Sequence, residues 1–294
     1  MKQKNINKIL EGLMQRYTTR VPDVKTIINA MIKNNIIQSA NDIINDHIAF
    51  RTMGVPQLGI QSLEKIFIHY GYTKEDYFNF KTKKLNAFWY SPPKTPKNLP
   101  RIFISECRVN DFSKKSQTII KKYTDQIPTD PVKTLNLDNP TAIDHFLHTP
   151  LWKTPTLEDY EHLKQESEYA SWVIYNRYYL NHFTISIHAL PSPYNTLEQF
   201  NEFLKEQNIK LNTAGGEIKI SKDTFLKQSS TVSNEINASF PTKNNQTITT
   251  NIAGSYVEFA ERLMMPNNTR RDGFETGNAD KIFESTFSEQ IKKP

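Results

Sequence analysis

The sequence predicts an α+β fold in which one strand–helix–strand–strand–strand module occurs twice and forms a curled mixed sheet. The first observation is the order of hydrophobic patterns. A strand over residues 45–52 and a strand over residues 181–190 each precede an amphipathic helix and three further strand-like runs. The second observation is that His47 and His182 occupy matching places near the start of these two strands. The third is a helical pattern over residues 111–178, which separates the two modules.

The first half contains elements with recognisable boundaries. Asp23 follows Pro22 at the start of a helical pattern, and we expect it to cap that helix. We expect Gly71 to end the helix that follows the first strand. The expected elements are helices over residues 6–17 and 22–35, a strand over 45–52, a helix over 61–72, strands over 76–80 and 85–90 joined by a lysine-rich turn, and a strand over 101–109.

The second half repeats this order with little sequence identity, so the duplication is inferred from the order of elements. Its elements are the strand over 181–190, a helix over 196–209, and strands over 223–231, 233–240 and 255–264. We expect one compact catalytic unit with four parts: N-terminal helices plus the first module (1–110), the helical insertion (111–178), the second module (179–265) and a C-terminal cap (266–294).

The composition is that of a globular protein and excludes several classes of function. Of the 294 residues, 37% are hydrophobic and 23% are charged, with a formal net charge of +6. The lysines are scattered and no nucleic-acid motif is present, so we expect no nucleic-acid partner. No apolar run approaches the roughly 20 residues that cross a bilayer, so we expect no membrane span. The polar start and the single cysteine, Cys107, predict a cytoplasmic protein.

Three of the expected strands carry unusual polar residues on one face. Because strand side chains alternate between faces, His47 and Arg51 share one side of their strand while Ile48 lies on the other. The strands that contain His182 and Glu258 alternate in the same way. An ordinary half-exposed strand has the same pattern, and its polar residues would simply be solvated.

A metal site is the second interpretation of these residues. If the two modules face each other across a curled sheet, His47, His182 and Glu258 converge inside it. Two histidines and one carboxylate, with coordination positions left open, form the ligand set of non-haem Fe(II) oxygenases, and zinc or nickel could occupy the same set. From spacing alone, a metal-binding role and a structural role remain equally open.

Arg51 also has two interpretations. Most arginines form surface salt bridges. If His47 is a metal ligand, however, Arg51 lies two same-face positions farther along the strand, within reach of a substrate held at the metal. A planar guanidinium there could bind a substrate carboxylate in a bidentate manner while the metal holds the other end.

Five motifs in order resemble one known family. They are NDHIAFRT, NHFTISIH, GGEIKISKDTFLKQSST, GSYVEFAER and RRDGFETGNADKIFEST, and the similarity runs from about residue 10 to residue 287. Together they resemble the 2-oxoadipate dioxygenase/decarboxylase family, also called hydroxyglutarate synthases. This resemblance implies a fold of the vicinal oxygen chelate type.

The resemblance also implies roles for individual residues. His47, His182 and Glu258 match the iron ligands of the family, and Arg51 matches its substrate-carboxylate arginine. Gln228, in the KQSST motif, is expected to line the pocket.

The resemblance implies a non-haem Fe(II) enzyme whose partners are a small 2-oxo acid and O₂. It would oxidatively decarboxylate the acid and hydroxylate the shortened chain, converting 2-oxoadipate to 2-hydroxyglutarate. Zinc or nickel could be bound in place of iron. Two alternatives remain: a redox-neutral metal-dependent lyase or isomerase of the same fold, which needs no oxygen, and a non-catalytic metal- or ligand-binding protein, which turns over no 2-oxo acid.

Overall fold

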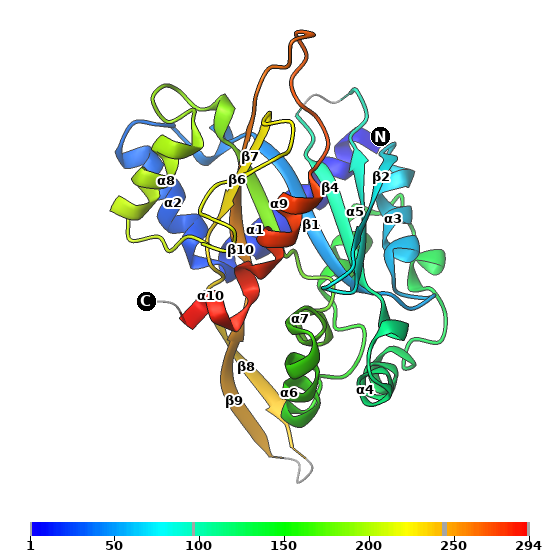
Figure 1. The fold of residues 1–294 in the computed structure, drawn as a ribbon. Coiled ribbons are helices and arrows are strands. Elements are labelled where there is room, and N and C mark those ends of the chain that lie inside the picture. The colour runs from blue at the N-terminus through cyan, green and yellow to red at the C-terminus, as the bar shows by residue number, and fades with distance from the viewer. Residues whose placement is uncertain (1, 96–97, 243–245, 293–294) are drawn as a thin grey trace.

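A mixed sheet of eight strands forms the centre of the computed structural model, which describes residues 2–95, 98–242 and 246–292 (Figure 1). In spatial order the strands are β2 (Thr73–Phe80), β3 (Leu85–Ser91), β4 (Arg101–Cys107), β1 (Asn45–Met53), β5 (His182–Ser186), β10 (Tyr256–Arg262), β7 (Leu226–Ser230) and β6 (Lys219–Ile220).

The predicted duplication is visible in this strand order. β1 and β5 pair antiparallel at the middle of the sheet, and each pairs in parallel with the last strand of its own module, β4 or β10. An antiparallel neighbour and an edge strand then follow on each side. The first strand of each module leads into a helix, α3 (Ile60–His69) or α8 (Leu197–Glu206). The α+β fold with duplicated modules is therefore confirmed.

The sheet is curled, as the contacts of one C-terminal helix demonstrate. Helix α9 (Thr276–Ile282) contacts β6 and β2, which are the two edges of the sheet. Eight strands laid flat would place these edges roughly 30 Å apart, whereas seven helical residues span only about 10 Å. Asn278 donates to the Lys219 carbonyl on β6 (3.2 Å), and Asp280 pairs with Lys83 in the β2–β3 turn (2.9 Å). Figure 1 shows α9 in front of the curved strands.

Both faces of the central strands are buried, so the alternative of half-exposed, solvated strands is wrong. Every residue of β5 and β10 is buried, as is β1 after Asn45. On the convex face, Ile48, Phe183 and Val257 belong to a hydrophobic cluster shared with the helices that cover this side. Those helices are α1 (Lys2–Arg20), α2 (Pro22–Lys33), α3 and α8. The concave face therefore holds the polar residues of the three strands away from solvent.

The helical insertion between the modules is present. It comprises α4 (Lys114–Thr124), α5 (Pro140–His148), α6 (Leu157–Glu166) and α7 (Glu168–Asn176). Trp172 of α7 is fully buried, and its indole donates to the Gly254 carbonyl just before β10 (2.7 Å). Packing of α7 against β1 thus closes one end of the concave face. The division of the chain into four parts stays a prediction.

Local details of the first half agree with the sequence at one helix end and differ at another. Gly71 follows the end of α3 with a φ of 90°, which a residue without a Cβ adopts most readily. Asp23 does not cap α2, because Val21 occupies the cap position and Pro22 the first turn. Asp23 instead accepts a hydrogen bond from Asn234 (3.1 Å).

Two expected strands of the second half differ from the sequence prediction. The expected strand over 233–240 corresponds to β8 (Glu235–Pro241), which pairs with β9 (Thr247–Ala253) in a separate two-stranded sheet. The short β6 takes its place in the module. The strand over 181–190 ends at Ser186, because Ile187–Ala189 forms a single 3₁₀ turn.

None of the helices in the described ranges has the length and apolar character needed to span a bilayer.

Candidate active site

Three chemically active side chains meet on the concave face at the junction of the two modules. His47 lies on β1, His182 on the adjacent β5, and Glu258 on β10 beside it, where Glu258 pairs with Thr184. The exposed fraction of each of the three residues is 6% or less. One ligand atom from each lies within 4.8 Å of the others. The structure therefore brings together the three residues that the sequence singled out.

The ligand atoms face a common point. Nε2 of His182 is 3.0 Å from one carboxylate oxygen of Glu258, and Nε2 of His47 is 3.5 Å from the other. The two imidazole Nε2 atoms are 3.3 Å apart. The hydroxyl of Thr184 lies 3.0 Å from the His47 Nε2 atom. Two imidazoles and one carboxylate form a donor set that suits a divalent transition metal with open coordination positions.

The remaining nitrogen of each imidazole has an oxygen partner on the preceding residue. Nδ1 of His47 is 2.8 Å from a carboxylate oxygen of Asp46, and Nδ1 of His182 is 3.1 Å from the amide oxygen of Asn181. Such partners fix the ring orientation and the tautomer, so that Nε2 stays unprotonated and available to a metal ion. The residues therefore fit a bound metal.

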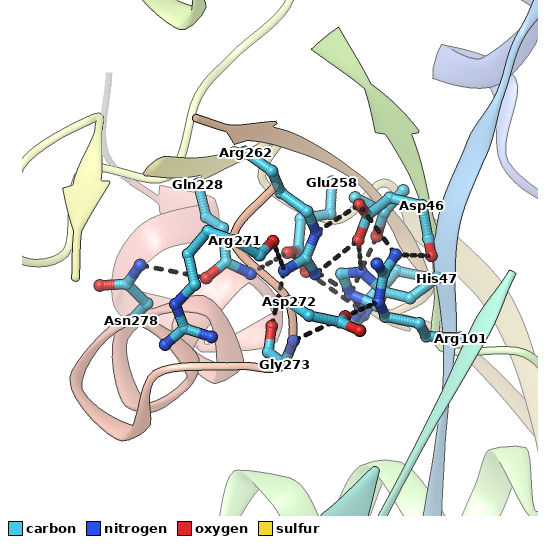
Figure 2. A network of polar contacts seen from close by, with 12 residues as sticks. Asp46, His47, Arg101, Gln228, Glu258, Arg262, Arg271, Asp272, Gly273 and Asn278 are labelled. Carbon is cyan, nitrogen blue, oxygen red and sulfur yellow. Dashed lines mark hydrogen bonds and ion pairs between the residues drawn. The ribbon is translucent and has the colours of Figure 1, made fainter. Parts of the chain in front are cut away.

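Asp46 is in turn held by a buried arginine from the other module. Arg262 donates from Nε (2.6 Å) and Nη2 (2.9 Å) to the two carboxylate oxygens of Asp46, and both side chains are 1% exposed. Nη1 of Arg262 donates to the Gly273 carbonyl (2.7 Å). Arg101 also lies beside Asp46, and it donates to Asp272 (2.6 Å). Figure 2 shows this network reaching from His47 to the C-terminal segment.

Two opposing effects determine the pKa values of this group. Burial favours the neutral form of each side chain, and the neighbouring opposite charges favour the ionised form. Burial opposes ionisation of Glu258, but the neighbouring imidazoles hold the pKa of its carboxyl well below the usual range. Burial likewise opposes protonation of His47, yet Glu258 and Asp46 raise the pKa of this imidazole. For His182 burial dominates and lowers the pKa. Protonation is therefore favoured more at His47 than at His182.

Gln228 lies at the cavity. Its side-chain amide donates to Glu258 (2.6 Å), and its own oxygen accepts from Asn278 of α9 (3.1 Å). These two bonds orient one oxygen of the Glu258 carboxylate.

A small cavity adjoins the His–His–Glu group. One wall comes from the C-terminal segment, where the ring of Phe274 packs edge-on against the His47 ring at a centroid distance of 4.8 Å. The lining residues are His47, Phe103, His182, Gln228, Tyr256, Glu258, Phe274, Ala279, Ile282 and Phe283.

Arg51 is buried, so the surface salt bridge considered for it is wrong. Its exposed fraction is 1%, and its guanidinium lies over the rings of Tyr169, Trp172 and Phe283. It donates to the Thr286 hydroxyl (2.8 Å) and to the Phe283 carbonyl (3.1 Å). Within the described part of the chain, no carboxylate pairs with it. Burial without an anion lowers the pKa of this guanidinium.

Several contributors to the site were not assigned roles by the sequence. Asp46 and Asn181 could have been found, because each directly precedes a histidine at the start of matching strands. Arg262 follows Glu258 on the same strand face, but its pairing with Asp46 depends on contact between the modules. His188, by contrast, lies outside the cavity and accepts a hydrogen bond from the Arg262 backbone (3.2 Å).

Known proteins resemble this chain over nearly its full length. The family model described as 2-oxoadipate dioxygenase/decarboxylase matches residues 9–270. The chloroplastic 2-oxoadipate dioxygenase/decarboxylase of Arabidopsis thaliana is 41% identical over 299 residues, which is 94% of this chain and 76% of the relative.

Solved structures agree with the observed fold. The hydroxyglutarate synthase of Oryza sativa, solved in complex with 2-oxoadipate, superposes with a TM-score of 0.86 at 38% identity and covers 99% of this chain and 95% of its own. A structure from Ralstonia eutropha, described as a glyoxalase superfamily protein, has a TM-score of 0.70 at 17% identity over 92% of this chain and 85% of its own. The expected fold of the vicinal oxygen chelate type is thus confirmed.

The expected cytoplasmic location is contradicted by the Arabidopsis relative, which is chloroplastic. The inference used the single cysteine, Cys107. A low cysteine count indicates a reducing environment, and it does not distinguish the cytoplasm from another reducing compartment.

The match over residues 9–270, together with the identity to the Arabidopsis relative, settles the family. This chain belongs to the 2-oxoadipate dioxygenase/decarboxylase family.

Proposed function

We propose that this protein is a non-haem Fe(II)-dependent dioxygenase that converts 2-oxoadipate and O₂ to 2-hydroxyglutarate and CO₂. The observation that carries this proposal is a buried His–His–Glu group on the same strand face as a buried arginine, Arg51. Arg51 has no carboxylate partner among the described residues. The names of the relatives support the choice of 2-oxoadipate.

His47, His182 and Glu258 are the residues that would hold the metal. A bound ferrous ion would supply the redox chemistry with O₂ that oxidative decarboxylation requires. A redox-neutral lyase or isomerase with zinc or nickel at the same residues is the competing function. Only the oxidative reaction consumes O₂, so oxygen dependence distinguishes the two.

Other residues near the His–His–Glu group would bind and orient the substrate. Arg51 would bind the carboxylate far from the metal, because a buried guanidinium gains most from an anionic partner. Phe274 and Phe283 line the cavity with apolar surface. Gln228 holds the Glu258 carboxylate in place. Fixing both ends of the substrate orients the chain for hydroxylation after CO₂ has left.

Oxygen consumption tests the reaction directly. Protein loaded with Fe(II) under anaerobic conditions and then mixed with 2-oxoadipate and O₂ should consume O₂ and release CO₂ and 2-hydroxyglutarate in equal amounts. His47→Ala should abolish turnover because it removes a metal ligand. His145→Ala is the matched control, since His145 is exposed on α5 and should leave the rate unchanged. Iron-loaded protein that uses no O₂ with any 2-oxo acid would exclude the dioxygenase.

Asp46→Asn tests the support of His47. The substitution replaces the carboxylate with a neutral amide, which is a weaker acceptor for the Nδ1 proton of His47. We therefore expect metal affinity to fall about 10- to 100-fold. The buried Arg262 would lose its anionic partner, and the free energy of unfolding should fall by roughly 3–5 kcal/mol. The measurements are competition titrations with Co(II) and thermal unfolding.

The control for Asp46→Asn is Asp272→Asn. Asp272 also pairs with an arginine of the network but is not bonded to either imidazole. Equal metal affinity in Asp46→Asn and wild type would show that Asp46 does not support the metal ligand.

Metal affinity should also depend on pH. Because the pKa of His47 is raised in the metal-free protein, a proton competes with the metal at this imidazole. Affinity should therefore rise with pH up to the His47 pKa, by up to about tenfold per pH unit, and then level off. Zn(II) competition titrations between about pH 5.5 and 8.5 measure this, and an affinity independent of pH would contradict the assigned protonation.

Arg51→Met and Arg51→Ala test substrate binding separately from metal binding. Both remove the cation, and methionine retains much of the apolar packing against the three aromatic rings. We expect kcat/KM for 2-oxoadipate to fall at least about 100-fold, since the distal carboxylate loses a charged partner. Iron content, measured by elemental analysis, should stay at the wild-type level. Loss of iron in both variants would mean that Arg51 supports the metal site instead.

A further inference from the structure

Asn278 is a buried amide that connects the C-terminal segment to the metal-ligand group. It lies on α9, is 2% exposed and directly precedes Ala279, which lines the cavity. Its side-chain nitrogen donates to the amide oxygen of Gln228 (3.1 Å), and the Gln228 nitrogen donates in turn to Glu258 (2.6 Å). Figure 2 shows these side chains in succession. The proposed reaction gives a role to Gln228 and leaves Asn278 unexplained.

The Gln228 amide has two possible orientations in its place, because its oxygen and its NH₂ group are of similar size. Only one of them suits Glu258. The neighbouring imidazoles keep this carboxyl ionised by lowering its pKa, so the NH₂ group can donate to it, whereas the amide oxygen would be repelled. The donor that Asn278 presents to the Gln228 oxygen favours the orientation that Glu258 requires.

Backbone groups fix the orientation of the Asn278 amide itself. Its side-chain nitrogen also donates to the Lys219 carbonyl on β6 (3.2 Å) and to the Leu226 carbonyl on β7 (3.4 Å). A carbonyl oxygen only accepts hydrogen bonds, so the NH₂ group of Asn278 must face these two atoms. Its two hydrogens serve three acceptors, and one hydrogen is therefore shared. The sheet backbone thus determines the orientation of both amides.

The bond from Gln228 affects how Glu258 can bind a metal. It engages one carboxylate oxygen, while the other oxygen lies 3.0 Å from Nε2 of His182. Carboxylates bind metals through one oxygen or through both. Hydrogen bonds to a ligating carboxylate fix its orientation, so the bond from Gln228 favours coordination through the other oxygen alone.

We propose that Asn278 is a positioning residue of the metal site. Through Gln228 it keeps Glu258 in the orientation that offers one oxygen to the metal, and the coordination position that a second oxygen would take stays open for substrate. This inference rests on the proposed function for the presence of a metal at the His–His–Glu group. The alternative is a purely structural role, because the bonds from Asn278 to the backbone of β6 and β7 also attach α9 to the sheet.

The experiment measures the absorption spectrum of Co(II)-loaded protein without oxygen, since the d–d bands of Co(II) lose intensity as the coordination number rises. Asn278→Ala and Asn278→Leu both remove the donor, and leucine retains a branched side chain of similar size. We expect weaker bands in both variants. Addition of 2-oxoadipate, followed by the same bands, should show about tenfold or more weaker binding, the effect of one hydrogen bond to a charged group.

A double variant tests whether Asn278 acts through Gln228. Gln228→Ala should weaken the Co(II) bands in the same way as Asn278→Ala. Adding Asn278→Ala to Gln228→Ala should then change the affinity for 2-oxoadipate by less than about twofold, whereas two independent effects would multiply.

Asp280→Asn is the control for attachment of α9. Asp280 lies on the same helix, pairs with Lys83 in the β2–β3 turn (2.9 Å) and is not among the residues that line the cavity. This variant should lower the melting temperature, because it removes a contact between the helix and the sheet. Its Co(II) bands and its affinity for 2-oxoadipate should equal those of the wild type.

Three results would overturn the inference. They are wild-type bands in both Asn278 variants, a change confined to one of the two when both are folded, and effects that multiply in the double variant. If one of the two variants does not fold, the other decides.

Turnover of the wild type with O₂ is measured separately, because the Co(II) spectrum requires no reaction. Weaker bands in the variants of a protein that turns over no 2-oxo acid would contradict the dioxygenase and leave the role of Asn278 intact. Turnover by the wild type with unchanged bands in the variants would do the reverse.

Discussion

The buried ion pair between Asp46 and Arg262 is the interaction on which the candidate site depends. Asp46 comes from the first module and Arg262 from the second, so the pair joins the two half-sheets beside the metal-ligand group. Two charges that are each 1% exposed lose most of their hydration, and the loss is offset because both carboxylate oxygens receive hydrogen bonds. The same carboxylate also accepts from His47. The same carboxylate therefore links the two modules and orients the His47 ring.

The two faces of the sheet have different roles. The convex face is apolar and packs against four helices, which stabilises the fold without specifying chemistry. The concave face buries histidines, carboxylates and arginines, and most of these are satisfied by one another. The guanidinium of Arg51 is also buried there, and it lies over three aromatic rings with no carboxylate partner among the described residues.

The ligand strands could be predicted from the sequence because their pattern is local. Alternation of apolar and polar residues around His47, His182 and Glu258 fixes which side chains share a face, and the strand order then brings the faces together. The strand over 233–240 alternates equally well, yet it pairs with β9 outside the main sheet. Pairing partners are chosen by long-range contacts, and the two residues of β6 are too few to form a pattern.

The surroundings of Arg51 could not be predicted for the same physical reason. Its direction along β1 follows from strand geometry, but its hydrogen-bond partners Thr286 and Phe283 come from a 3₁₀ helix more than 230 residues later in the chain. Such a short helix has no periodic signature. Because Phe283 also lines the cavity, the C-terminal segment both closes the site and fixes two of the guanidinium nitrogens. The position of the Arg51 guanidinium therefore depends on a contact between the first module and the end of the chain.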